Sequence, residues 1–436
     1  MYFIIETSQQ LSKLSPSDSC FIQVVSSSDR YHPRLSRCSL VYYNDGAKGY
    51  IFPVNHSEGF SLEIAQIQCF INSHKKVYLL DRKYHSYFLQ IDNAIDLNFI
   101  RMDQGVDESK FECDTLVHRD FYMRMGLMPN LNEIIPITKH YERCQCLYNK
   151  VESLFDLEND HSVLDRASQA YGWVEKQGIA INEDLLDDAY TVQSKSSFIK
   201  GGLIYSYYNM YNTTGRPTNS FNGVNFVAVP KTEKFRQCFI PRYDFMVEAD
   251  QDAYHLRLIA KEVGYEFENK DQSIHNELGK LYFNKEQLTE EEYCTSKEIT
   301  FKQLYGGIED QYKNIPLFLK TGNFIEDIWK RYKKNGSITL PTGVLLRRDS
   351  EMNRLKLFNY WVQNLETKTN VEKIEDIEVY MNKIKCNSKL VLITYDAFLF
   401  DYSVEDGKEF LVGIKSILEK GDFKIKIKYG KSYYFK

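Results

Sequence analysis

Several features that would assign a class at once are missing from this chain of 436 residues. Its 9 cysteines include no C-x-x-C pair, and Cys144 and Cys146 are too close together and too isolated for a tetrahedral zinc site. No stretch approaches the ~18 apolar residues that a membrane-spanning helix needs. The start, M-Y-F-I-I-E-T-S-Q-Q, lacks the basic and apolar regions of a signal peptide. These absences predict a cytoplasmic protein with reduced thiols.

The bulk composition is that of an ordinary globular protein with two or three domains. Hydrophobic residues make up 43% of the chain and charged residues 26%. The 32 tyrosines and 27 phenylalanines suit long grooves and stacking surfaces, but a genome of low GC content would produce the same enrichment, and we favour this second explanation. The net charge of −5 neither shows nor excludes a basic groove for duplex phosphates, because such a groove is a local feature.

The hydrophobic pattern predicts an α/β portion up to residue 147 and an α+β portion in the rest of the chain. Strands are predicted at Cys20–Val25, Ser39–Tyr43, Gly49–Val54 and Lys76–Leu80. Helices are predicted at Ser61–Asn72, Lys83–Gln90 and Ser162–Gln177, the last of which ends at Gly178. The segment Gly201–Gly223 is predicted to be a loop. From Phe245 onward strands and helices alternate irregularly, which predicts an antiparallel sheet.

Two aspartates are predicted at strand ends, where a rigid sheet fixes the position of a side chain. Asp250 follows the apolar strand Tyr243–Ala249, and Asp396 lies at the tip of a hairpin, between Lys389–Thr394 and Phe398–Tyr402. Taken singly, each aspartate is more simply a helix cap or a turn residue. Taken together, they match a two-metal phosphoryl-transfer site, in which two Mg²⁺ ions lie roughly 3.5–4 Å apart. Phosphates and water would complete the coordination of each ion.

A third segment, K-E-I-T-F-K-Q-L-Y-G, predicts a helix that ends or bends at the Gly306-Gly307 pair. Lys297, Phe301 and Tyr305 are four residues apart and therefore share one face. On this face the cation could hold a triphosphate, the first ring a base, and the second ring the template side. The alternative is an amphipathic helix whose lysine reaches out to solvent.

In this order, the three segments resemble motifs A, B and C of the family A DNA polymerases, the polymerase I type. The resemblance covers about residues 150–436, and it extends to T-G-R at Arg216, R-Q-C-F from Arg236, S-I-H at His275, T-L-P-T-G-V-L-L-R-R, and N-Y-W-V-Q from Asn359 to Gln363. It implies that Asp250, Asp396 and Lys297 are catalytic and that the two aspartates hold two Mg²⁺ ions. The other implied roles are nucleotide binding by Arg236, His255, His275, Lys297, Phe301 and Tyr305, and DNA binding by Arg216, Asn359, Gln363 and Tyr395.

The same resemblance implies the right-hand α+β fold of a polymerase, with an antiparallel palm sheet, helical fingers and a reduced thumb. Only 38 residues (216 − 178) separate Gly178 from Arg216, where the family has a long helical thumb that grips duplex DNA. Its loss would lower processivity and implies a processivity or replisome partner, or a task that needs only short synthesis. The implied parts are 1–147 (exonuclease-like), 148–200 (reduced thumb), 201–257 (palm, motif A), 258–335 (fingers, motif B) and 336–436 (palm, motif C).

The N-terminal portion resembles a proofreading 3′–5′ exonuclease domain of ribonuclease H-like α/β fold that has lost its catalytic acids. The expected Asp and Glu fall at Val24 and Ser26, and a further expected Asp falls at His85, with Asp114 as a candidate remnant. Because such an exonuclease needs several carboxylates for its own two metal ions, we expect a folded but inactive domain with a structural or DNA-guiding role.

The polymerase portion also departs from the family pattern. Motif C is Tyr395-Asp396-Ala397, which keeps the metal ligand but loses the acidic neighbour. His255 replaces the motif A Glu that packs on the sugar, which leaves the choice between deoxyribose and ribose open. Tyr293 replaces an Arg that contacts phosphate, and a contact of that kind is commonly worth about 1.5–3 kcal/mol.

The sequence therefore predicts a DNA polymerase without proofreading that binds primer–template DNA and dNTPs. The alternative is a weak or inactive polymerase relic that acts as a DNA-binding scaffold in a replication complex. A third hypothesis, an enzyme that uses ribonucleotides, rests on His255 alone. The small size and the low-GC composition indicate a phage, plasmid or other mobile replicon in a bacterial cytoplasm.

Overall fold

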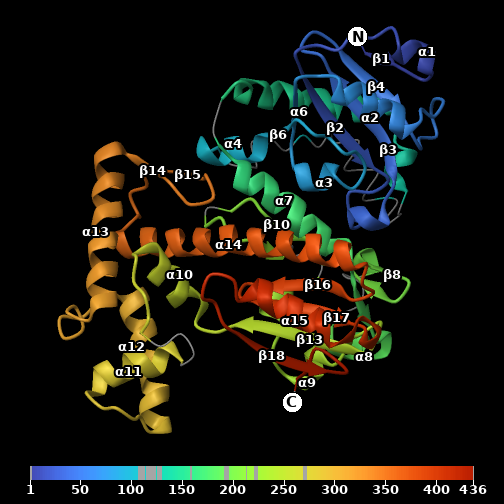
Figure 1. Ribbon diagram of the computed structural model, residues 1–436. Coiled ribbons are helices and arrows are strands. Elements are labelled where there is room, and N and C mark those ends of the chain that lie inside the picture. Colours follow the sequence, from blue (N-terminus) through green and yellow to red (C-terminus); the bar gives the residue numbers. More distant parts are fainter. Residues whose placement is uncertain are drawn as a thin grey trace. The chain divides into compact units, whose positions relative to one another are not determined.

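The computed structural model of the chain describes residues 2–106, 113, 124, 130–157, 160–190, 196–212, 214–219, 224–268 and 273–435. Asp114 lies outside these residues. The chain divides into two compact units, each with its own sheets and helices (Figure 1). The first unit consists of Met1–Tyr211 with Thr218–Ile240, and the second of Asn212–Pro217 with Pro241–Lys436. The finer borders expected from the sequence stay predictions.

A six-stranded sheet in the order β1-β4-β3-β2-β5-β6 organises the first unit. Strands β2, β3 and β4 are antiparallel neighbours, whereas β5 runs parallel to β2 and β6 runs parallel to β5. The strands predicted from the sequence are found within one or two residues of their expected bounds. The bounds are β1 Phe3–Ile4, β2 Ser19–Ser26, β3 Cys38–Asn44, β4 Gly49–Pro53, β5 Lys76–Leu79 and β6 Ala94–Asp96.

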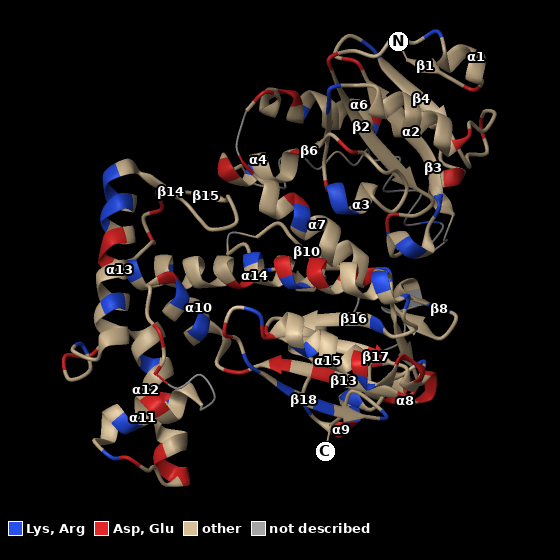
Figure 2. Ribbon diagram, in the orientation of Figure 1, with Lys and Arg blue, Asp and Glu red and all other residues tan. Residues whose placement is uncertain are grey.

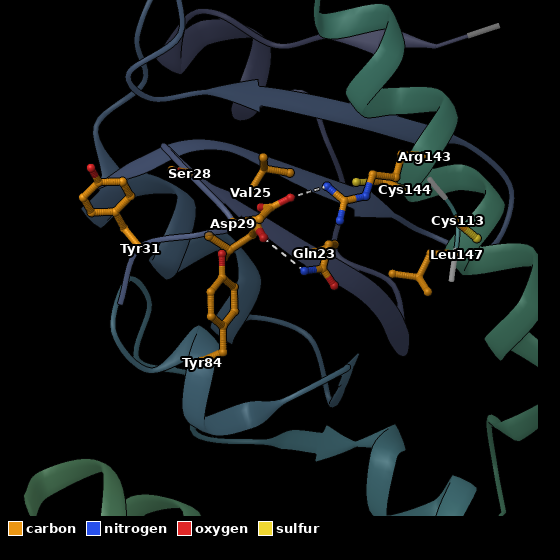
Figure 3. A pocket seen from close by; sticks show the side chains of 11 residues that line it. Gln23, Val25, Ser28, Asp29, Tyr31, Tyr84, Cys113, Arg143, Cys144 and Leu147 are labelled. Atoms are coloured by element: carbon orange, nitrogen blue, oxygen red, sulfur yellow. Dashed lines mark hydrogen bonds and ion pairs between the residues drawn. The ribbon is translucent and has the colours of Figure 1, made fainter. Parts of the chain in front are cut away.

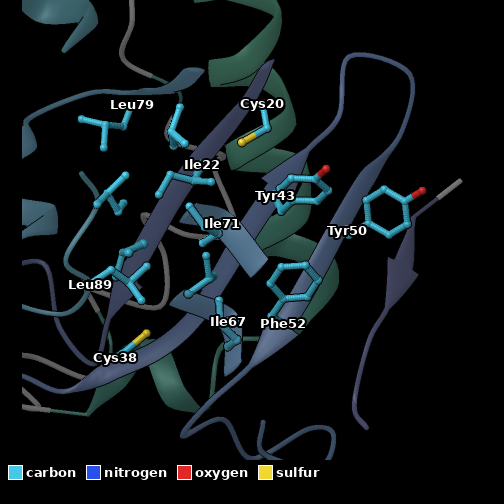
Figure 4. Packing of buried hydrophobic residues seen from close by; sticks show 14 of the residues in the cluster. Cys20, Ile22, Cys38, Tyr43, Tyr50, Phe52, Ile67, Ile71, Leu79 and Leu89 are labelled. Carbon is cyan, nitrogen blue, oxygen red and sulfur yellow. The ribbon is translucent and has the colours of Figure 1, made fainter. Parts of the chain in front are cut away.

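Both faces of this sheet are covered by hydrophobic cores, because successive side chains of a strand point to opposite faces. From β2, Ile22 and Val24 point into the core that is completed by Ile67 and Ile71 of helix α2 (Ile64–Asn72; Figure 4). On the other face, Phe21 and its neighbours pack against residues of helix α6 (Ile137–Val151). A fully buried side chain of this size contributes about 1.5–3 kcal/mol relative to an exposed one.

The helices of the first unit are short, apart from α6 and α7. A second sheet, in the order β12-β7-β9-β8, and a two-stranded ribbon of β10 and β11 complete the unit. The helices are α1 Ser8–Leu11, α2 Ile64–Asn72, α3 Arg82–His85, α4 Leu97–Asp103, α6 Ile137–Val151, α7 Ser162–Glu175, α8 Glu183–Ala189 and α9 Glu233–Arg236. The strands are β7 Ile179–Ile181, β8 Ile199–Lys200, β9 Leu203–Ile204, β10 Tyr208–Asn209, β11 Thr218–Asn219 and β12 Phe239–Ile240.

Two predictions for this unit need correction. The helix expected at Lys83–Gln90 ends at His85, because the chain then makes a tight turn in which the Phe88 N–H bonds to the His85 carbonyl at 3.0 Å. Leu89, which follows this turn, is buried in the core. The segment Gly201–Gly223 is not all loop, because β9, β10 and β11 lie within it and satisfy part of its backbone by strand pairing.

The second unit is built on a four-stranded sheet in the order β16-β17-β13-β18, in which all neighbours are antiparallel. This confirms the antiparallel sheet predicted for the C-terminal portion. The central strand β13 runs two residues further than expected, so Asp250 lies within the strand, near its end. The bounds are β13 Phe245–Gln251, β14 Ser337–Thr339, β15 Leu345–Arg347, β16 Lys389–Thr394, β17 Ala397–Tyr402 and β18 Ile425–Gly430.

Helix α14, with 31 residues, is the long element of this unit and contacts α10, α12, α13 and α15. Helix α12 begins at a capping box in which Thr289 and Glu292 satisfy each other's backbone N–H groups, and it ends at Gly307 as the sequence predicts. In the described part of the chain, no helix is long and apolar enough to cross a membrane. The bounds are α10 Tyr254–Glu262, α11 Ile274–Phe283, α12 Glu290–Gly306, α13 Pro316–Asn335, α14 Arg354–Ile384 and α15 Gly407–Leu418.

Candidate active site

The two predicted acids come from neighbouring strands of the second unit. Asp250 of β13 is in register with Ala397 of β17, the residue that follows Asp396. The Gln251 N–H donates a hydrogen bond of 3.0 Å to the carbonyl of Asp396. The β16–β17 turn is only two residues long, and Tyr395 takes a left-handed conformation there with φ of 61°. The hairpin thus holds Asp396 beside the end of β13.

Burial and the neighbouring carboxylate of Asp250 both perturb Asp396. Burial and the neighbouring charge of Asp250 raise the pKa of Asp396 to about 6. A divalent cation between the two would relieve this repulsion, and carboxylate oxygens are ligands that Mg²⁺ prefers. Among the residues that the structure describes, no group of three or more His, Cys, Asp or Glu side chains is arranged around a metal position. The donor set that fits is therefore the aspartate pair, with phosphate and water as the remaining ligands.

A cavity of about 280 Å³ surrounds the acids and gathers residues from several segments of the second unit that are far apart in the sequence. It brings together most of the residues that the sequence predicted for catalysis and for nucleotide binding. It also contains residues that sequence reasoning did not single out, among them Asp252, Thr300 and Lys426. The predicted residues in its lining are Arg216, Asp250, His255, His275, Lys297, Phe301 and Asp396.

Helix α12 presents the predicted face of a cation and two rings. The Lys297 ammonium lies 4.3 Å from the centre of the Tyr293 ring, one turn earlier. The Phe301 and Tyr305 rings are stacked, with centres 6.3 Å apart and planes at 9°. Phe301 remains 49% exposed, which leaves one side of this face open to a ligand.

His255 is held by two partners, one of which was not foreseen. In the tautomer that satisfies both contacts, the Tyr305 hydroxyl donates to Nδ1, and Nε2–H donates to Glu366 Oε2 at 2.5 Å. Glu366 of α14 is only 1% exposed, and it also accepts a bond of 2.9 Å from Arg216 Nε. The Arg216 guanidinium in turn lies 3.4 Å from the centre of the Tyr395 ring. Glu366 thus joins segments that are 150 residues apart in the chain.

His275 is a poor cation in this cavity. Burial is the main cause that lowers its pKa, to about 4, and the charges of Lys297 and Lys426 lower it further against the opposing charge of Asp252. At pH 7 the ring is therefore neutral. Its contribution to phosphate binding is that of a hydrogen-bond donor rather than of a charge.

The other residues predicted for DNA binding or nucleotide binding lie outside the lining of the cavity. Asn359 and Gln363 are four residues apart on α14, so they share a face, and both are half-buried. Arg236 ends α9 in the first unit. The roles expected for these three residues stay predictions.

In the first unit, the positions expected for exonuclease acids lie close together but carry none. The Val24 N–H donates to His85 Nε2 at 3.1 Å, and the Ser26 N–H donates to the Tyr84 hydroxyl at 3.2 Å. Val24 is buried in the core. A cavity of about 460 Å³ nearby is lined by Gln23, Tyr31 and Tyr84, among others (Figure 3).

The charges in this cavity are balanced. The carboxylate in its lining, Asp29, forms an ion pair of 2.8 Å with Arg143 of α6 (Figure 3). Among the residues that the structure describes, the lining of this cavity thus holds one carboxylate, which is paired with an arginine, whereas a two-metal exonuclease site requires several acids.

The second unit also contains a buried lysine. Lys373 of α14 is 4% exposed, and its ammonium lies 3.9 Å from the centre of the Phe423 ring and 4.9 Å from that of Tyr254. Its Nζ has no hydrogen-bond partner among the residues that the structure describes. Burial, and secondarily the charge of Lys261, lowers the pKa of Lys373 from 10.5 to about 7.

We expect Lys373→Met to raise the melting temperature at pH 7, by an amount that corresponds to a few kcal/mol at most. The unfolded chain keeps its lysine protonated up to about pH 10.5, whereas the folded chain loses this proton above about pH 7. The penalty is therefore full below pH 7 and disappears as the pH rises from 7 toward 10.5. Thermal unfolding between pH 6 and 10 measures it, with Lys368→Met at an exposed site on the same helix as the control. An equal effect of both substitutions would contradict the assignment.

Comparisons with known proteins give a structural relative and no sequence relative. No family model matches the chain, and no curated protein matches it. A solved structure that it resembles is described as the POL domain of Pol1 from M. smegmatis in complex with DNA primer-template and dNTP. The superposition covers 100% of this chain and 99% of that chain with a TM-score of 0.69, at 13% sequence identity. The chain therefore has a mixed α+β fold similar to that of a DNA polymerase domain.

Proposed function

We propose that this chain is a template-directed DNA polymerase that adds deoxynucleotides to the 3′-hydroxyl of a primer. The observation that carries the proposal is the cavity in which Asp250 and Asp396 lie side by side, with Lys297 in the same lining. The similarity to a polymerase domain solved with primer–template and dNTP supports it, because the same kinds of ligand would meet this cavity.

In this proposal Asp250 and Asp396 hold two Mg²⁺ ions, which would favour ionisation of the primer hydroxyl and neutralise the leaving pyrophosphate. The primer 3′-oxygen attacks the α-phosphorus in line, and the bond from this phosphorus to the pyrophosphate oxygen breaks. Lys297 neutralises charge on the phosphates. The exposed ring of Phe301 packs against the nucleotide, and Arg216 contacts the primer–template.

We further propose that the first unit is an exonuclease-like domain without proofreading activity. The sheet order, with three antiparallel strands followed by two parallel ones, is that expected of a ribonuclease H-like domain. The absence of carboxylates at Val24, Ser26 and His85 supports the loss of excision. Polymerisation would then proceed without removal of mismatched ends.

Sugar selection in this proposal depends on His255. Its ring is held by Tyr305 and Glu366 in the cavity lining, so it restricts space there. We expect His255→Ala to increase the use of ribonucleotides relative to deoxynucleotides by about tenfold, because the substitution removes a ring that restricts the space in the cavity. The ratio of kcat/KM for dNTP and rNTP measures it. An unchanged ratio would remove His255 from sugar selection, and equal use of both sugars by the wild type would favour a ribonucleotide-using enzyme.

Primer extension tests the proposed function. A labelled primer–template is incubated with the full chain, Mg²⁺ and four dNTPs, and binding of the same DNA is measured in a shift assay. Extension that depends on Mg²⁺ supports a polymerase. Tight DNA binding without any extension would instead favour the scaffold alternative.

A further inference from the structure

The last strand of the chain places a second lysine in the candidate active site. Lys426 of β18 lies in register with Asp250 of β13 and lines the same cavity as Lys297. Its ammonium forms an ion pair with Asp252. In Figure 2 the basic stretch of β18 runs beside the acidic stretch of β13.

Few cations in the cavity lining are available to bind phosphate, and Lys426 is one of them. Three aspartates line the cavity, Asp250, Asp252 and Asp396, and a phosphate-bearing substrate adds more negative charge. Of the cations in the lining, Arg216 is bound to the buried Glu366, and His275 is neutral at pH 7. Lys297 and Lys426 therefore remain as the ammonium groups that can meet phosphate oxygens.

On helix α12, the residue one turn before Lys297 is Tyr293, and its hydroxyl lies 3.0 Å from the Ser273 hydroxyl. Because this residue is a tyrosine and not a second basic residue, Lys297 is the single cation on this face of α12. Lys426 lies close enough to Tyr293, Asp250 and Asp252 to be affected by the charge of each. A cation from β18 thus lines the same cavity as the cation of α12.

We propose that Lys426 binds the phosphates of the incoming nucleoside triphosphate together with Lys297. This inference rests on the proposed polymerase function. The ammonium leaves Asp252 when a triphosphate enters, because several phosphate oxygens attract it more strongly than one carboxylate. The side chain is 61% exposed, so it can turn toward the ligand with little rearrangement.

The same strand provides a matched control. Lys428 is two residues further along β18, so it points to the same face, but it lies opposite Glu248 and outside the cavity lining. We expect Lys426→Ala to raise the KM for dNTP about 10- to 100-fold, the effect of one lost charge-assisted contact. The Kd for primer–template should stay within about twofold, and Lys428→Ala should leave both quantities unchanged. Lys426→Arg should retain most of the affinity for dNTP.

A double substitution separates direct binding from simple neutralisation of Asp252. If Lys426 binds phosphate, Lys426→Ala with Asp252→Asn keeps a high KM for dNTP. Recovery of the wild-type KM in the double variant would overturn the proposal, because Lys426 would then only mask Asp252. Equal weakening of DNA binding by Lys426→Ala and Lys428→Ala, with no change in KM, would also overturn it and assign β18 to the nucleic-acid backbone.

Failure of the polymerase function itself would be recognised separately. In that case the wild type extends no primer, and KM cannot be measured. Equilibrium binding of Mg²⁺–dATP to the wild type, Lys426→Ala and Lys428→Ala then tests the phosphate site without chemistry. Selective loss of binding in Lys426→Ala supports the site, and equal binding by all three proteins rejects it.

Discussion

Substitution of either Asp250 or Asp396 by alanine is expected to reduce primer extension by at least about 10³-fold. In the proposed mechanism the two carboxylates act as one unit, because each would hold a metal ion that the other also faces. Burial first, and the charge of Asp250 second, raise the pKa of Asp396, so the two acids are coupled. Loss of one acid therefore removes most of the effect of both. Single-turnover extension rates of the two variants, measured at saturating Mg²⁺ and dNTP, test this.

The same experiment separates a catalytic loss from a folding defect. Asp396→Asn removes a charge whose ionisation burial and Asp250 disfavour, so this variant should melt no lower than the wild type without divalent cations while losing extension. Asp310→Ala, in an exposed part of the same unit, is the matched control and should retain full activity. Extension by Asp396→Asn at more than about a tenth of the wild-type rate would contradict the metal-ligand role.

The largest expected effect on stability comes from a buried ion pair in the first unit. Lys83 and Glu175 are 1% and 0% exposed, and Lys83 Nζ lies 2.9 Å from Glu175 Oε1. The Tyr87 hydroxyl donates to the same carboxylate at 2.6 Å, and the Lys83 ammonium lies 3.2 Å from the centre of the Tyr207 ring. Glu175→Ala would leave a buried ammonium without its counter-charge, which costs about 3–5 kcal/mol.

This loss should lower the melting temperature of the first unit by on the order of 10 °C. Differential scanning calorimetry of the full chain measures it. Lys83→Met combined with Glu175→Leu should recover most of the stability, because an apolar pair replaces both charges. By contrast, Glu142→Ala breaks an exposed ion pair with Lys139 and should cost about 1 kcal/mol or less. A similar small effect from Glu175→Ala would show that water reaches the buried pair.

Local sequence patterns predicted much of the fold because the elements concerned are determined by their own residues. The apolar alternation of β2 and the capping and glycine signals of α12 act within one element, so strands and helices were found near their expected places. Helix α3 was predicted too long because the pattern of apolar residues does not show the turn that follows His85, after which Leu89 packs into the core. The same limitation applies to the short strands within Gly201–Gly223.

In the candidate site, too, local sequence patterns predicted some residues, whereas tertiary contacts determine others. Asp250, Asp396 and Lys297 could be predicted because each belongs to a short segment with a recognisable pattern. Glu366 and Lys426 could not, since neither lies in such a segment. Their roles arise from partners 150 and 174 residues away, Arg216 and Asp252, which only the folded chain brings near. Alternate lysines in the last strand were the one available signal for Lys426.

Template-directed incorporation of a single nucleotide tests the central claim most directly. Four primer–templates that differ only in the first templating base are each given one dNTP at a time, with Mg²⁺, in the presence of the full chain. The proposed function predicts that the primer grows by one nucleotide only when the dNTP is complementary to that base. Incorporation that ignores the template, or no incorporation while the DNA is bound, would contradict it.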